Sequence, residues 1–114
     1  MEFDSQKPIY LQICESVCED ILAGDLQGGN RIPSVRELGE LLQVNPNTIM
    51  RSYERLTSQG IIYNKRGVGY FVAIDAREKV LAERRERFFN EELPRLRKYI
   101  QLLEIDRQQI IDSL

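Results

Sequence analysis

Asparagine, threonine and arginine side chains recur at helical spacing in the stretch "NTIMRSYER", which begins at Asn47. Asn47, Thr48 and Arg51 fall on one side of a helix, and Ser52 and Arg55 extend that side. An amide and a guanidinium can each make two parallel hydrogen bonds, and the edges of adenine and guanine offer matching pairs of groups. Polar helix faces most often only contact water. These residue types alone therefore do not distinguish a solvated helix face from one that recognises base edges.

The residues around this stretch predict where its helix begins and ends. Asn45 is a favoured N-cap and Pro46 a favoured first helical residue. Gly60 is a favourable stop, so we expect a helix over residues 46–59. Its buried side should carry Ile49, Tyr53 and Leu56, with Tyr53 acting mainly in packing.

Three further elements are predicted around this helix. Residues 8–23 have a helical stripe of apolar side chains that ends at Gly24. Ser34 stands three residues before Glu37, the spacing of a capping box, which predicts a short helix. After Gly60, the runs "IIYNK" and "GYFVAI" are joined by a basic glycine turn and predict a β-hairpin. The apolar faces expected are Ile9, Ile13, Val17 and Ile21 with Tyr10, Cys14 and Leu22 in the first helix, and Val35, Leu38, Leu41 and Leu42 in the second.

Two helices with a tight link, followed by a hairpin with a basic tip, are the layout of a winged helix-turn-helix. The fold class predicted is therefore α+β, mainly α. We expect a winged helix-turn-helix domain over residues 1–75 and a short helical dimerisation tail over residues 76–114. In the tail, Pro94 predicts a kink or a restart and Asp106 caps a last short helix. The apolar residues spaced 4-3-4-3, a heptad seam suited to dimerisation, are Phe89, Leu93, Leu96, Ile100 and Leu103.

Basic residues gather in the middle of the chain, although the whole chain is acidic. Residues 30–70 hold six basic and three acidic side chains, a net charge of +3, against −2 for all 114 residues. Arg36, Lys65 and Arg66 stand where phosphates or a minor groove would lie if the second helix entered a major groove. Ser34, at a helix N-terminus, can also meet a phosphate. We therefore expect binding to double-stranded DNA through Ser34, Arg36, Asn47, Thr48, Arg51, Lys65, Arg66 and Gly67.

Other chemistries are poorly supported by the composition. The chain has no histidine, the commonest general base, and no phosphate-binding glycine motif, so we expect no enzyme and no cofactor. Cys14 and Cys18 lack further ligands for a metal and are predicted to be small core residues. No apolar run approaches the roughly 18–20 residues that span a bilayer, and the acidic N-terminus does not resemble a signal peptide, so we expect a cytoplasmic protein without a membrane partner.

The stretches "PIYLQI" and "RIPSVRELGELLQVNPNTIMRSYERLTSQGIIYNKRGVGYFV" closely resemble the winged-helix domain of GntR-type bacterial transcription regulators. The resemblance covers residues 8–74, and the tail resembles the short dimerisation segment of the YtrA-like subfamily. It implies a homodimeric transcription factor, most often a repressor, on a pseudo-palindromic operator. Two arginines common in the wider family are replaced by Pro46 and Met50, so Arg51 is expected to supply the base-reading guanidinium.

Several alternatives stay open at this stage. A winged helix can be a protein-protein interaction module without a DNA-reading role, although such a module would not need basic residues on one surface. Arg36 could form a structural pair with Glu40, Ser34 could serve only as a cap, and the tail seam could pack onto its own domain. The operator, the regulated genes and any small-molecule effector are unknown from the sequence.

Overall fold

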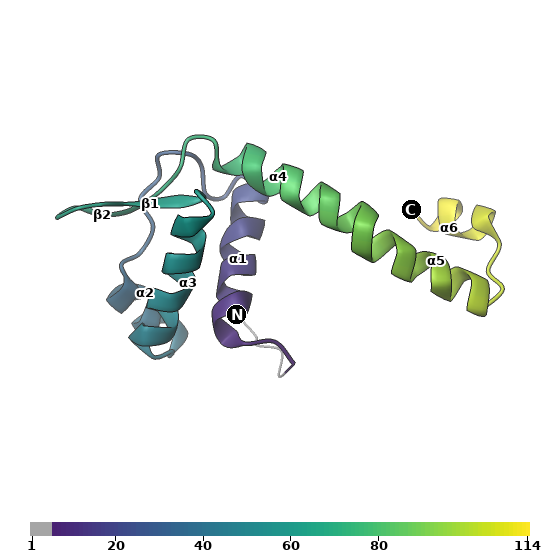
Figure 1. The fold of residues 1–114 in the computed structure, drawn as a ribbon, viewed down its shortest axis with the longest axis horizontal. Coiled ribbons are helices and arrows are strands. Elements are labelled where there is room, and N and C mark those ends of the chain that lie inside the picture. Colours follow the sequence, from purple (N-terminus) through teal and green to yellow (C-terminus); the bar gives the residue numbers. More distant parts are fainter. Residues whose placement is uncertain (1–5) are drawn as a thin grey trace. The chain divides into compact units, whose positions relative to one another are not determined.

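The computed structural model describes residues 6–114, and the first five residues, where the first predicted domain begins, lie outside this range. The described chain forms two compact units, the first ending at Leu81 and the second running over Ala82–Leu114. The domain boundary predicted at residues 75 and 76 stays a prediction. The elements in chain order are α1 (Ile9–Ala23), α2 (Val35–Leu42), α3 (Pro46–Ser58), β1 (Ile62–Lys65), β2 (Gly69–Val72), α4 (Ala76–Arg87), a π-helical turn (Phe88–Glu92), α5 (Leu93–Leu102) and α6 (Arg107–Ser113) (Figure 1).

Helix α1 lies against α3 and ends at Gly24, which adopts a left-handed conformation with φ of 88°. Of the predicted apolar stripe, Ile13 and Ile21 are buried, whereas Ile9 is 41% exposed. The buried face is turned toward Cys14 and Cys18, which are 5% and 9% exposed. Both cysteines are buried members of the core and form no disulfide, in agreement with their predicted role as small core residues.

Helix α2 begins with the predicted capping box. The Ser34 hydroxyl oxygen accepts the backbone N–H of Glu37 at 3.1 Å, and the Glu37 carboxylate accepts the backbone N–H of Ser34 at 3.4 Å. The prediction that Leu41 is buried is wrong, since this side chain is 71% exposed. At 3.6 residues per turn Leu41 lies about 100° before Leu42, outside the arc that faces the core.

The link between α2 and α3 is a close turn. The backbone N–H of Val44 donates to the carbonyl of Gly39 at 2.9 Å, and Gln43 takes a left-handed conformation with φ of 56°. A Cβ atom at Gly39 would lie 2.9 Å from the carbonyl oxygen of Val44, closer than real contacts allow. Asn45 then caps α3 by accepting the N–H of Asn47 at 2.8 Å. The tight link therefore depends on the absence of a side chain at Gly39.

Helix α3 is the central element of the first unit. Its inner side is fully buried, with Ile49 and Leu56 at 0% exposure and Tyr53 at 1%. Ser52, predicted on the polar outer side, is also 0% exposed, so that placement is wrong. Ser52 lies within one turn of both Ile49 and Leu56, and its hydroxyl donates to the carbonyl of Tyr10 on α1 at 2.8 Å. A polar residue can occupy this core position because its hydrogen bond is satisfied.

The predicted hairpin is formed by β1 and β2, which pair antiparallel with Tyr63 opposite Phe71 and Lys65 opposite Gly69. It projects from the helices in Figure 1. The extended residues before α2 join β2 through an isolated bridge between Arg31 and Phe71, and the N–H of Ile32 donates to the carbonyl of Tyr70 at 3.0 Å. With a two-stranded wing on a mainly helical domain, the predicted fold class is confirmed.

The second unit is helical. A π-helical turn ends where the N–H of Leu93 donates to the carbonyl of Phe88, immediately before Pro94. Proline removes one N–H donor and crowds the preceding turn, so this widened turn is the irregularity that the sequence predicted at Pro94. Asp106 caps α6 in a capping box with Gln109, as expected for the last helix. None of the helices in residues 6–114 is long and apolar enough to cross a membrane.

Burial changes the acidity of two core side chains. Burial, aided by the neighbouring Cys18, raises the pKa of the Cys14 thiol from 9.0 to about 11. Burial also raises the pKa of the Tyr53 hydroxyl, with a smaller contribution from Tyr70. Between pH 9 and 11 the unfolded chain therefore releases a proton that the folded chain keeps at Cys14, so folding becomes less favourable as the pH rises.

We expect the free energy of unfolding to fall between pH 9 and 11 by on the order of 2 kcal/mol through Cys14. Urea unfolding at a series of pH values measures this loss. The variant Cys14→Ala lacks the thiol and should lose correspondingly less stability over the same interval. Equal pH dependence of the wild type and the variant would contradict a buried, protonated thiol at this position.

Candidate nucleic-acid interface

The predicted contact residues lie on three segments of the first unit: the start of α2, the outer side of α3 and the turn between β1 and β2. Arg36, Asn47 and Arg51 are exposed, as are all three predicted residues of the hairpin turn. Ser34 and Thr48 are half-exposed. The predicted set is Ser34, Arg36, Asn47, Thr48, Arg51, Lys65, Arg66 and Gly67, and none of its members is buried.

The start of α2 offers a hydroxyl and a guanidinium. The Ser34 oxygen accepts one backbone N–H, which leaves the hydroxyl hydrogen of Ser34 able to donate to an anion. Capping and phosphate binding can therefore coexist at this serine. Arg36 forms no ion pair with Glu40 or with any other residue in the described range, so the predicted structural alternative for Arg36 is not seen.

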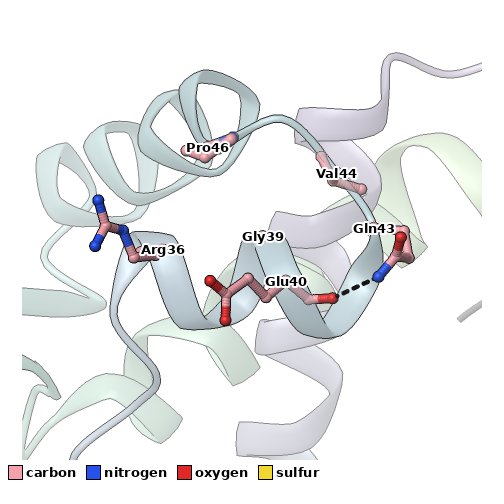
Figure 2. A pocket seen from close by; sticks show the side chains of 6 residues that line it. All are labelled: Arg36, Gly39, Glu40, Gln43, Val44 and Pro46. Atoms are coloured by element: carbon pink, nitrogen blue, oxygen red, sulfur yellow. Dashed lines mark hydrogen bonds between the residues drawn. The ribbon is translucent and has the colours of Figure 1, made fainter.

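A groove of about 400 Å³ separates α2 from the start of α3. Figure 2 shows Arg36 and Glu40 on its α2 side, Pro46 on its α3 side, and the hydrogen bond from the Gln43 side chain to the Glu40 carbonyl. The groove is open and has a guanidinium and a carboxylate on its wall. It leads from Arg36 to the first turn of α3, where Asn47 follows Pro46. The residues that line it are Arg36, Gly39, Glu40, Gln43, Val44 and Pro46.

The outer side of α3 presents Asn47 in the first helical turn and Arg51 one turn later. The guanidinium carbon of Arg51 lies 3.9 Å from the centroid of the Tyr10 ring, on the first turn of α1. The sequence does not predict this contact. Nothing in either segment signals it, because it depends on how α1 packs against α3.

The turn between the strands is short and basic. The N–H of Val68 donates to the carbonyl of Lys65 at 2.8 Å, and Gly67 has φ of 78°, a left-handed conformation that favours glycine. A Cβ atom at Gly67 would meet nothing within 4 Å, so the space around this glycine is open. The Lys65 ammonium lies 5.9 Å from the centroid of the Phe71 ring. The tip can thus bring Lys65 and Arg66 close to an approaching anion.

The basic residues of these three segments have no carboxylate partner in the described residues. Within residues 6–114, no carboxylate lies within 4.0 Å of the charged groups of Arg36, Arg51, Arg55, Lys65 or Arg66. Some lysines and arginines in other segments are paired, as in the 2.9 Å contact of Lys7 with Glu15 and the 3.2 Å contact of Lys79 with Asp75, whereas others, such as Arg77 and Arg97, have no carboxylate partner in the part of the chain that the structure describes. Cations without carboxylate partners keep their charge available for phosphates.

The described residues contain no group of three histidine, cysteine, aspartate or glutamate side chains that could hold a metal ion. The arrangement is therefore one of hydrogen-bond donors and positive charge. It is suited to a polyanion with readable polar edges, which is the chemistry of duplex DNA.

Comparison with known proteins agrees with this arrangement. The sequence profile of the family described as "Bacterial regulatory proteins, gntR family" matches residues 9–72. The HTH-type transcriptional regulator YhcF of Bacillus subtilis is 33% identical over 113 residues, which cover 99% of this chain and 92% of that protein. The HTH-type transcriptional repressor YtrA of the same organism is 37% identical over 92 residues, 81% of this chain and 70% of that protein.

Two solved structures are also similar to this chain. A GntR family transcriptional regulator from Listeria monocytogenes superposes with a TM-score of 0.81 at 33% identity, covering 97% of this chain and 96% of that one. The DNA-binding domain of AraR in complex with the operator ORR3 superposes with a TM-score of 0.58 at 32% identity, covering 64% of this chain and 88% of that one. The AraR structure is thus that of a DNA-binding domain bound to operator DNA.

Replacement of Ser34 by alanine should lower the free energy of unfolding by about 1 kcal/mol, because the N–H of Glu37 loses its acceptor. Urea denaturation measures the loss. The control is Ser34→Asp, which keeps a capping oxygen and should unfold close to the wild type. Equal stability of Ser34→Ala and wild type would show that the cap contributes nothing to folding.

Proposed function

Because the chain belongs to the GntR family of bacterial regulatory proteins, we propose that it is a dimeric repressor that binds a pseudo-palindromic operator. Membership of the family makes the chain a DNA-binding transcriptional regulator and not an enzyme. The dimer, the repressor role and the operator symmetry are the proposed part. The site of action would be the cytoplasm, where bacterial DNA is found.

The observation that carries the proposal is the set of cations without carboxylate partners on three separate segments. Arg36, Arg51 and the wing-tip pair Lys65 and Arg66 are exposed and have no carboxylate within 4.0 Å in the described part of the chain. A polyanionic partner explains why exposed cations gather on three segments that share one core. A protein-interaction module, the alternative function, would not need that gathering.

Each segment has a role in the proposed complex. The outer side of α3 would enter a major groove about 12 Å wide, where Asn47, Thr48 and Arg51 meet base edges. The start of α2, with Ser34 and Arg36, would contact phosphates or a neighbouring base. The wing tip would contact the backbone or a minor groove, and Gly67 would allow a close approach. These residue roles are proposals.

The tail supports a dimer. Three residues of the predicted heptad seam, Phe89, Leu96 and Leu103, are 57%, 43% and 66% exposed in the single chain. Leu93 and Ile100, the other two, are half-buried. Apolar side chains that recur with this spacing and remain uncovered suit a helix packing against a second copy.

A symmetric dimer would place two α3 helices on half-sites about one helical turn apart, roughly 34–36 Å. Two such helices bound at a promoter would exclude other proteins, which is the simplest mechanism of repression. The relative YtrA is named as a transcriptional repressor. An effector, if one acts, is unidentified.

Selection of bound fragments from random duplex DNA, with the full chain as bait, tests the proposal directly. A preferred sequence with two-fold symmetry and half-sites one turn apart is the expected result. Recovery of a single asymmetric half-site would contradict the dimeric arrangement. Recovery of no preferred sequence would contradict DNA reading and favour the interaction module.

Replacement of Arg51 by alanine should reduce discrimination between the selected site and a site altered at one base pair by about 1–3 kcal/mol. Lys65→Ala should instead weaken binding to all duplexes alike and reduce the salt dependence by about one unit. Fluorescence anisotropy titrations at several salt concentrations measure both effects. The assignment fails if both variants bind as the wild type does.

The stable cap variant Ser34→Asp separates folding from binding in the same titrations. If Ser34 meets a phosphate, the new carboxylate repels it, and binding weakens for every sequence although the fold is intact. Unchanged binding by Ser34→Asp would limit Ser34 to its capping role.

Replacement of Leu96 by aspartate should convert the dimer into a folded monomer, because a carboxylate cannot be buried in an apolar seam without a partner. Sedimentation shows the mass and circular dichroism shows the helix content. The matched control is Leu102→Asp, a leucine of the same helix outside the seam that is 64% exposed. Loss of helix content in Leu96→Asp would mean that the seam packs within its own chain.

A further inference from the structure

The side chain of Arg51 is not isolated in the free protein. Its guanidinium carbon lies 3.9 Å from the centroid of the Tyr10 ring, well within the range in which a cation is attracted to an aromatic face. Arg51 makes no side-chain hydrogen bond or ion pair with the rest of the described chain. The Tyr10 ring is therefore the contact that orders this arginine.

The position of Tyr10 is itself fixed by the core. The hydroxyl of Ser52, which is fully buried on α3, donates to the backbone carbonyl of Tyr10 at 2.8 Å. One turn further along α1, the Cys14 thiol donates to the carbonyl of Ser52 at 3.4 Å. Because Arg51 and Ser52 are neighbours on α3, these contacts hold the first turn of α1 beside the base of the Arg51 side chain.

Contact with a ring leaves the hydrogen-bonding capacity of the guanidinium unused. Arginine has five N–H donors in one plane, and the ring takes none of them from a base. A long side chain that is already ordered loses less conformational freedom when it binds. The contact can therefore favour recognition without competing with it.

We propose that Tyr10 is a positioning residue for DNA recognition, whose ring holds the guanidinium of Arg51 in the orientation in which it reads a base. Sequence discrimination then depends on the first turn of α1, a segment outside the helix-turn-helix. This inference rests on the proposed function, since it concerns how Arg51 meets DNA.

The first test uses the free full-length chain and no DNA. The Nε–Hε signal of Arg51 in NMR spectra should show an upfield ring-current shift and restricted motion. Tyr10→Leu should abolish both, whereas Tyr10→Phe, which keeps the ring, should retain both. The backbone carbonyl that accepts from Ser52 is present in all three chains. An Arg51 signal that is unchanged in Tyr10→Leu would overturn the proposal regardless of any DNA result.

The second test uses the duplex recovered by selection with the wild type and its single-base-pair variants. Tyr10→Leu should reduce discrimination at the base pair read by Arg51 by about three- to tenfold, and Tyr10→Phe should stay within about twofold of wild type. In the Arg51→Ala background Tyr10→Leu should have no further effect on discrimination, because the arginine it orders is gone. The matched control Arg55→Ala, an exposed arginine one turn away, should combine with Tyr10→Leu additively.

Other results of the binding test would contradict the role proposed for the Tyr10 ring or the proposed function itself. Equal weakening on all duplexes by Tyr10→Leu, or increased discrimination, would overturn positioning by the ring. Equal effects of Tyr10→Phe and Tyr10→Leu would do the same and assign the role to the hydroxyl. A wild-type chain without any preferred duplex would refute the proposed function, which the NMR result alone cannot do. Thermal unfolding of each variant confirms that it is folded.

Discussion

The arrangement of the first unit depends on the contacts of one buried side chain, that of Tyr53. Its ring is 1% exposed, its hydroxyl donates to the carbonyl of Pro33 at 2.7 Å, and its edge meets the Tyr70 ring with centroids 4.8 Å apart. Pro33 immediately precedes the cap of α2, and Tyr70 belongs to the wing. One side chain of α3 therefore contacts both of the other segments that carry candidate DNA contacts.

These contacts of Tyr53 explain how a small domain can keep three segments in fixed relative positions. Side chains on surface loops move independently, whereas these segments share a core whose buried members extend from α1 to Val80 in α4. A close-packed interior resists displacement of one member without the others. The second unit has a different character: several of its large apolar side chains, among them Phe89, Leu96 and Leu103, are exposed within a single chain. Its stability is therefore tied more closely to what covers those side chains than to its own interior.

Most of the local structure could be predicted from the sequence, because caps and turns depend on residues a few positions apart. The box of Ser34 and Glu37 and the start of α3 at Pro46 are of this kind. Positions decided by packing could not be predicted in the same way: the sequence pattern predicts a buried Leu41 and an exposed Ser52, and the structure shows the reverse. The contact of Arg51 with a ring on α1 also depends on tertiary packing. The candidate site was predictable as residue types at an exposed surface, but base contacts depend on a partner that the sequence does not contain.

The close approach at Gly39 has a consequence for comparing sequences. Polar residues like those of α3 can occur in any solvated helix, so their presence in another chain says little about how that helix is held. A side chain at the position of Gly39 would collide with the backbone of the following turn and force α2 and α3 apart. Where a related sequence has a larger residue there, the two helices cannot meet as they do here. Contact residues should then not be transferred from one chain to the other, however well the residues of α3 agree.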